Sequence, residues 1–170
     1  MEKRVSQVKI LGILCGLTGL WASSAQAEIL EDDRSDIAGV IERYTTSWNG
    51  RHGEKFGVDF TEDADFVNIY GMHFKGRTEI EARHVAILTR FLSGSRLQIG
   101  VVTLREAQPG TIIAHVPWTI DGYREPSEGS TAVDARTAGV QRKGLFTQVF
   151  IRRDARWMIT ASHNVMEPSR

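Results

Sequence analysis

The chain has 170 residues with 21 basic and 21 acidic side chains, so its formal net charge is zero. It therefore lacks the basic excess that nucleic-acid binding requires, and nucleic acid is not an expected partner. A single cysteine, Cys15, excludes an internal disulfide bond.

The first 27 residues have the pattern of a secretory signal peptide. Basic residues precede an apolar run, Ile10–Trp21, which is followed by Ala25-Gln26-Ala27. The run is shorter than the roughly 20 helical residues that crossing a hydrocarbon core requires, which argues against a membrane anchor. We expect cleavage after Ala27, a mature domain of residues 28–170 without a cysteine, and a periplasmic or secreted location with no membrane attachment.

Helices are expected first in the mature chain. Apolar residues at helical spacing predict a long helix from Glu31 to Trp48. Phe56 and Phe60 predict a shorter second helix, and a capping box that starts at Thr78 predicts the beginning of a third. His84 falls on the apolar stripe of this third helix.

Strands are expected in the rest of the chain. One is predicted from Ala64 to Tyr70, and the four others after Ser93 are Arg96–Arg105, Ile112–Asp121, Gly139–Arg152 and Arg156–Val165. The polar stretch 122–139 is expected to form a long hairpin loop. Helices followed by an antiparallel meander predict one α+β domain.

Several sequence motifs for cofactors and metals are absent. The chain has no glycine-rich nucleotide motif, no Gly-x-Ser-x-Gly and no zinc motif. Its five histidines are scattered, and no two are separated by one helical turn. We therefore expect neither a cofactor nor a metal.

Four blocks of sequence resemble the SgcJ/EcaC branch of the SnoaL-like proteins, in the nuclear transport factor 2-like superfamily. They are Thr61–Gly71, Gly76-Arg77 before Ile80 and His84, Arg142–Val149, and Trp157 with Ser162–Asn164. The resemblance implies a cone-shaped barrel in which three N-terminal helices pack on a curved, mainly antiparallel sheet. It also implies a homodimer and a pocket for a small, largely apolar molecule. The branch carries the label oxidoreductase, although the superfamily contains many chemistries and also non-catalytic binders.

A second resemblance, without gaps from Arg43 to Gly71, is to the ketosteroid isomerases. It places Tyr44 at the tyrosine that donates to the developing enolate oxygen, and Asn68 at the general base. A neutral amide is not a useful base near neutral pH, and no carboxylate between Gly139 and Arg153 is present to act as the second donor. Unmodified isomerase chemistry is therefore not expected.

Three residues are candidates for catalysis: His84, His163 and Tyr44. His84 is expected to be buried and neutral, and strand alternation places His163 on the same face as Trp157 and Ile159. Together the two histidines would supply a base and an acid. The expected ligand-binding residues are Asn68, Trp48, Phe66, Trp118 and Asn164. As alternatives, His84 and Tyr44 are core residues with satisfied polar atoms, and Asn68 supports the turn at Gly71.

Two functions fit these observations. The first is an exported pocket protein that binds a small, largely apolar molecule, with or without isomerase-, lyase- or oxidoreductase-type activity. The second is a non-catalytic binding module or a dimeric assembly module of the same fold.

Overall fold

The computed structural model describes residues 29–123 and 140–168 of the chain. The expected signal peptide and most of the expected polar loop lie outside this range. The described elements are helix α1 (Glu31–Asn49), a 3-10 turn (Gly53–Lys55), β1 (Phe60–Val67), β2 (His73–Lys75), α2 (Gly76–Leu88), β3 (Arg96–Ile99), β4 (Thr103–Gln108), β5 (Thr111–Tyr123), β6 (Val140–Arg153) and β7 (Arg156–Met166).

Helix α1 is amphipathic along its whole length. Glu31, Asp32 and Asp33 lie in its first turn, where the positive end of the helix dipole favours acidic side chains. Its buried stripe runs from Ile37 to Trp48, as the helical spacing predicts. The helix ends where the Gly50 N–H donates to Thr46 O at 2.8 Å.

The expected second helix is wrong. Only a single 3-10 turn, Gly53–Lys55, precedes Phe56, and Phe60 already belongs to β1. Both phenylalanines are nevertheless buried. A turn followed by a strand can bury two residues that are four positions apart, as a helix does. Gly53 packs closely against α2, because a Cβ on it would lie only 2.3 Å from Val85 N. A residue with a side chain would therefore not fit at this turn.

Helix α2 starts three residues earlier than the capping box indicates, at Gly76 and not at Glu79. Gly76 has a φ of +78°, and a Cβ on it would lie 2.9 Å from Glu62 O, so glycine suits this position. The Glu79 carboxylate accepts from the Lys75 N–H at 2.8 Å, whereas no side chain caps the helix from Lys75 itself. The predicted box of Thr78 with Glu81 therefore does not form, and Glu79 bonds the backbone at the start of the helix instead.

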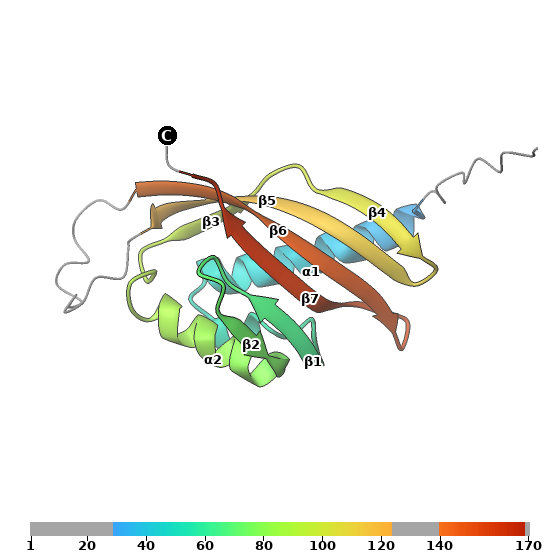
Figure 1. Cartoon of the computed structure of the whole chain (residues 1–170), viewed down its shortest axis with the longest axis horizontal. Helices are drawn as coiled ribbons and strands as arrows, with labels where there is room; N and C mark the ends of the chain where they lie inside the picture. The colour runs from blue at the N-terminus through green and yellow to red at the C-terminus, as the bar shows by residue number, and fades with distance from the viewer. Residues whose placement is uncertain (1–28, 124–139, 169–170) are drawn as a thin grey trace, which may run out of the picture.

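The seven strands form one curved sheet in the order β2-β1-β7-β6-β5-β3, and β4 also pairs with β5 (Figure 1). All pairs are antiparallel except β1 with β7, so the sheet is mainly antiparallel, as expected. A two-residue turn at Asp154-Ala155, both with positive φ, joins β6 to β7.

The single strand expected at Arg96–Arg105 is two strands, because pairing with β5 is interrupted opposite Pro117. Strand β3 pairs with β5 up to Ile99, which lies opposite Trp118. Strand β4 starts to pair with β5 at Thr103, which lies opposite His115. Proline has no N–H to donate, so on this side of β5 Pro117 only accepts a bond, from the Gly100 N–H to Pro117 O at 2.8 Å.

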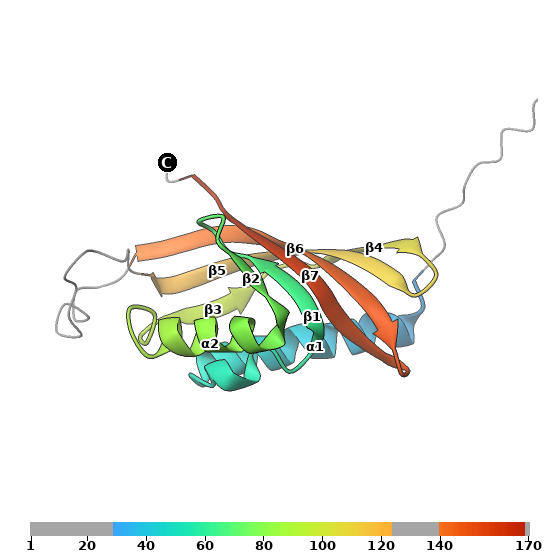
Figure 2. The same ribbon diagram turned by 60° about the horizontal axis from the view of Figure 1, so that its bottom comes forward.

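Both helices lie on the same face of the sheet, as Figure 2 shows. The core between the two layers includes Ile37 of α1, Ile80 of α2 and the inward side chains of β5 and β6. Within the described residues, no helix has both the length and the apolar character that crossing a bilayer requires. The fold therefore has an inner sheet face covered by helices and an outer face that the described elements leave uncovered.

Candidate functional site

A cavity of about 60 Å³ lies between α2, the end of α1 and the inner face of the sheet. Six of the eight predicted site residues line it: Trp48, Phe66, Asn68, His84, Trp118 and Asn164. The other lining residues are Ile69, Tyr70, Arg83, Ile87, Phe91, Leu92, Leu97, Ile120 and Phe146. The cavity is thus mostly apolar, with a few polar groups that come from four separate elements and one turn.

His84 is buried in an aromatic cage. Its ring stacks on Phe56 and meets Phe66 edge-on, with the Phe66 centroid at 5.3 Å. Nδ1 lies 2.7 Å from Ile80 O one helical turn earlier, so this nitrogen carries the proton and donates it. Burial lowers the pKa of His84 to about 4, so the ring is neutral at physiological pH.

Asn68 supports the turn that follows β1. Its Oδ1 accepts from the N–H groups of Tyr70 and Met72, each at 2.9 Å, and its backbone completes the turn through Met72 O and the Gly71 N–H. Asn68 also lines the cavity on the same strand face as Phe66. Asn68 therefore has both of the roles considered from the sequence: it supports the turn at Gly71 and it lines the cavity.

Trp118 and Asn164 meet across the sheet. The indole N–H of Trp118 donates to Asn164 Oδ1 at 2.8 Å. Gly144 lies directly beneath the indole, because a Cβ there would be 2.2 Å from the ring. The glycine of β6 therefore sets the depth to which Trp118 sits in the cavity wall.

Trp48 lines the cavity from the last turn of α1. Its indole N–H donates to Ser95 Oγ at 3.1 Å, and Ser95 Oγ in turn donates to Leu92 O at 2.7 Å. This chain of bonds ties α1 to the segment after α2. The indole N–H is thereby engaged, and Trp48 contributes an apolar wall.

Tyr44 does not line the cavity. It is 2% exposed and packs against Phe56 and Phe146, so these rings separate it from the space that His84 borders. Burial raises the pKa of Tyr44, an effect that the nearby Gln148 amide partly offsets. Neither Tyr44 Oη nor Gln148 Oε1 makes a well-formed hydrogen bond with another group of the described chain.

His163 is on the outer face of the sheet, so its expected place beside Trp157 and Ile159 is wrong. The register between β6 and β7 shifts between Val149–Ala161 and Phe150–Ile159, which leaves Thr160 as an extra residue in β7. One added residue reverses the alternation of side chains. Asn164 consequently faces inward and His163 outward, and the predicted pair of histidines does not form.

Some cavity residues were not singled out from the sequence. Arg83 lies at the wall, with its guanidinium 5.7 Å from the Phe74 ring centroid, and Leu97 and Ile120 contribute apolar surface. Arg83 immediately precedes His84, and adjacent residues of a helix do not share a face. Helical geometry alone therefore does not predict that both line one cavity. No group of three or more acidic or histidine side chains in residues 29–123 and 140–168 could hold a metal ion.

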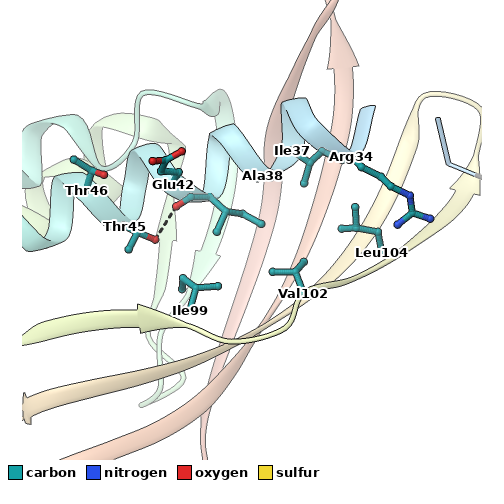
Figure 3. Close-up of a pocket in the computed structure, with 10 residues that line it drawn as sticks. Arg34, Ile37, Ala38, Glu42, Thr45, Thr46, Ile99, Val102 and Leu104 are labelled. Carbon is teal, nitrogen blue, oxygen red and sulfur yellow. Dashed lines mark hydrogen bonds between the residues drawn. The ribbon is translucent and has the colours of Figure 1, made fainter. Parts of the chain in front are cut away.

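A second, larger space lies on the other side of α1. This groove of about 500 Å³ runs between α1 and the strands β3 and β4 (Figure 3). It shares no lining residue with the cavity at His84. None of the predicted site residues lines it.

Comparison with known proteins identifies the fold. No protein-family model and no curated protein sequence matches the chain. Among solved structures, an uncharacterised protein with a cystatin-like fold from Caulobacter vibrioides matches with a TM-score of 0.69 and 26% identity, over 81% of this chain and 91% of that one. A cystatin-like domain of unknown function from Nostoc punctiforme matches with a TM-score of 0.68 and 26% identity, over 83% and 81%.

A third structure has the same fold. An NTF-2 like protein of unknown function from Shewanella oneidensis matches with a TM-score of 0.60 and 16% identity, over 78% of this chain and 98% of that one. The chain has the cystatin-like, nuclear transport factor 2-like fold. Since this fold supports many activities, function has to be argued from the cavity itself.

Proposed function

We propose that this protein is a SnoaL-like pocket protein that binds a small, largely apolar molecule carrying a hydroxyl group and a carbonyl oxygen. The observation that carries this proposal is the tautomer of His84, in which Nδ1 and not Nε2 carries the proton. Its Nδ1–H is committed to Ile80 O, so Nε2 is a bare acceptor on a residue that lines the cavity. A ligand hydroxyl is the group that such an acceptor would bind.

The two asparagines complement this acceptor. Asn68 Oδ1 is engaged by backbone N–H groups and Asn164 Oδ1 by Trp118, so within the described residues each amide has its NH₂ group left to donate. Amide donors favour a carbonyl oxygen. The polar groups of the cavity therefore suit a molecule with one donor and one acceptor on an otherwise apolar frame.

The size of the cavity limits the ligand. Its 60 Å³ is well below the roughly 300–1,000 Å³ typical of drug-sized ligands. A single substituted ring that enters in part, with its remainder near Tyr70 and Arg83 at the wall, fits this space better than a steroid or polyketide.

Binding is favoured over acid–base catalysis. A general base works best with a pKa near the operating pH, and His84 with a pKa of about 4 is a weak proton acceptor. Asn68 is no base, and Tyr44 is walled off by aromatic rings. The oxidoreductase activity that the SgcJ/EcaC resemblance implies is accordingly not proposed.

Calorimetric titration with 3-hydroxybenzaldehyde and with benzaldehyde, which lacks the hydroxyl, tests the proposal. We expect the hydroxyl to tighten binding about fivefold, equivalent to roughly 1 kcal/mol for one hydrogen bond. His84→Phe should abolish this preference while retaining an aromatic ring against Phe56. The matched control is His52→Phe, at an exposed histidine that does not line the cavity. Equal affinity of the wild type for both aldehydes would contradict the proposed role of His84.

Export is a separate proposal that rests on the first 27 residues. The basic start, the apolar run and the Ala25-Gln26-Ala27 site support secretion to the periplasm or beyond. Mass spectrometry of the protein from the periplasmic fraction should give Glu28 as the first residue. A retained Met1 would contradict it.

A homodimer through the outer sheet face is also proposed. Three adjacent rows on β5, β6 and β7 contain no Asp, Glu, Lys or Arg: Ile113, Val149 and Ala161; His115, Thr147 and His163; Pro117, Leu145 and Val165. Val165 is 48% exposed on this face. A two-fold interface brings each patch against its own copy, so a patch without net charge is self-compatible.

Sedimentation velocity tests the dimer. Val165→Arg should convert it to a monomer, because two copies would bury like charges near each other. Val101→Arg is the matched control, since Val101 is 86% exposed between β3 and β4 and belongs to none of the three rows. A monomeric wild type at micromolar concentration would contradict the proposal.

A further inference from the structure

The groove between α1 and the β3–β4 edge is an apolar channel with a charged residue toward each end. Its walls are Ile37 and Ile41 on the helix side and Ile99, Val102 and Leu104 on the strand side, as Figure 3 shows for four of them. At about 500 Å³ it falls within the size range of ligand-binding pockets.

The groove follows from two features of the sequence. The break opposite Pro117 turns the segment between β3 and β4 away from the ladder, which leaves Val102 only partly buried. On the helix, the small and exposed Ala38 stands where a larger side chain would fill the space. The apolar walls therefore remain open to a ligand.

The charges give the groove a direction. Arg34 lies near Leu104, and Glu42 follows eight residues later, about 12 Å along the helix axis. Arg34 Nε donates to Ile29 O at 3.3 Å, and no carboxylate pairs with its guanidinium within the described part of the chain. An anionic head group is attracted at the Arg34 end and repelled at the Glu42 end.

We propose that this groove binds a straight-chain carboxylate, with the head group at Arg34 and the alkyl chain along Ile41, Ile99 and Val102. The length of the groove along α1 and its apolar walls match an unbranched chain. The single cation at one end matches one negative charge. The site is independent of the cavity at His84, because the two have no residue in common.

Calorimetric titration of the purified protein with dodecanoate, below its micelle concentration, tests the site. Dodecyltrimethylammonium, with the same chain and the opposite charge, is the control ligand. We expect dodecanoate to bind up to about fivefold more tightly, the upper value for one partly exposed ionic contact. Arg34→Gln should remove this difference, whereas Arg90→Gln, at an exposed arginine after α2, should preserve it.

Ala38→Phe tests the groove itself, since it fills the channel from an exposed helix position without touching the core. It should lower dodecanoate affinity at least tenfold and leave 3-hydroxybenzaldehyde binding unchanged. Equal affinity for the two dodecyl ligands would overturn the proposal, as would unchanged dodecanoate binding in Ala38→Phe. A change in sedimentation coefficient in Ala38→Phe, with dodecanoate affinity unaltered, would also overturn it and identify the groove as a contact between copies.

Discussion

The imidazole of His84 lies flat on the ring of Phe56, with the two centroids 3.5 Å apart and the planes 10° from parallel. Together with the bond from Nδ1 to Ile80 O, this stacking holds the ring in one orientation. The Phe66 ring covers another side of the imidazole, with the two ring planes at 87° to each other. A histidine enclosed in this way is excluded from water, and its charged form is the one that burial penalises.

The first prediction is that His84 makes stability depend on pH. Its pKa is about 4 in the folded protein and 6.5 in an unfolded chain, so the unfolded state binds more protons between these values. The contribution to stability is complete above pH 6.5 and is lost as pH falls toward 4, to a total of about 3 kcal/mol. Urea denaturation of wild type and His84→Phe between pH 4.5 and 7.5 measures it. Parallel pH profiles for the two proteins would show that His84 does not titrate with this shift.

The second prediction concerns Asn68→Asp, which restores the carboxylate of the isomerase pattern. We expect no isomerisation of an unsaturated ketone, measured by ultraviolet absorbance. The N–H groups of Tyr70 and Met72 would bind the new carboxylate, lower its proton affinity and orient it toward the turn.

Asn68→Ala serves as the structural control for this position. It removes the acceptor of both N–H groups and should lower the free energy of unfolding by about 1–3 kcal/mol, whereas Asn68→Asp retains an acceptor and should lower it less. Turnover by Asn68→Asp above the wild-type level would show that the side chain reaches a bound ketone.

The third prediction is that Tyr44→Phe changes the free energy of unfolding by less than about 1 kcal/mol. The hydroxyl that it removes is buried without a well-formed hydrogen bond, so little stabilising energy is lost. Tyr44→Ala should destabilise by about 3–5 kcal/mol, since it deletes a ring that packs on Phe56 and Phe146. Chemical denaturation compares the two variants, and affinity for 3-hydroxybenzaldehyde should be the same in Tyr44→Phe as in the wild type.

The fourth prediction uses two neighbours in β7 to test the reversal of side-chain alternation. Asn164→Ala should weaken 3-hydroxybenzaldehyde binding, because it removes an amide donor and releases the Trp118 indole that Asn164 holds. His163→Ala should leave that affinity unchanged, because His163 is exposed on the opposite face. Titration calorimetry of both variants measures the two affinities. Weaker binding by His163→Ala with unchanged binding by Asn164→Ala would mean that the bulge at Thr160 is absent in solution.

Much of the fold was predictable from local patterns. The long first helix, the strands β5, β6 and β7, and the α+β class follow from periodicities of 3.6 and 2 residues, which each segment carries by itself. The aromatic and amide residues of the cavity wall were also recognised, because a small sheet-and-helix domain must line its interior with apolar side chains.

Errors arose where a local pattern has two solutions. Phe56 and Phe60 are four residues apart and both buried, which a helix satisfies as well as a turn that enters a strand. The capping-box sequence at Thr78 likewise fits two helix starts. Gly76, with its positive φ beside Glu62 O, determines which one forms.

The sequence alone determined which residues are apolar, which can carry a proton, and in what order helices and strands occur, because these properties belong to single side chains and to short segments. Only the tertiary structure decided that His84 shares a cavity with Asn68 and Asn164 and that His163 does not. That decision depends on one extra residue in β7, whose position is set by pairing with β6 and β1 rather than by β7 itself. Strand alternation is a local rule, but the register that applies it to one face or the other is a property of the whole sheet.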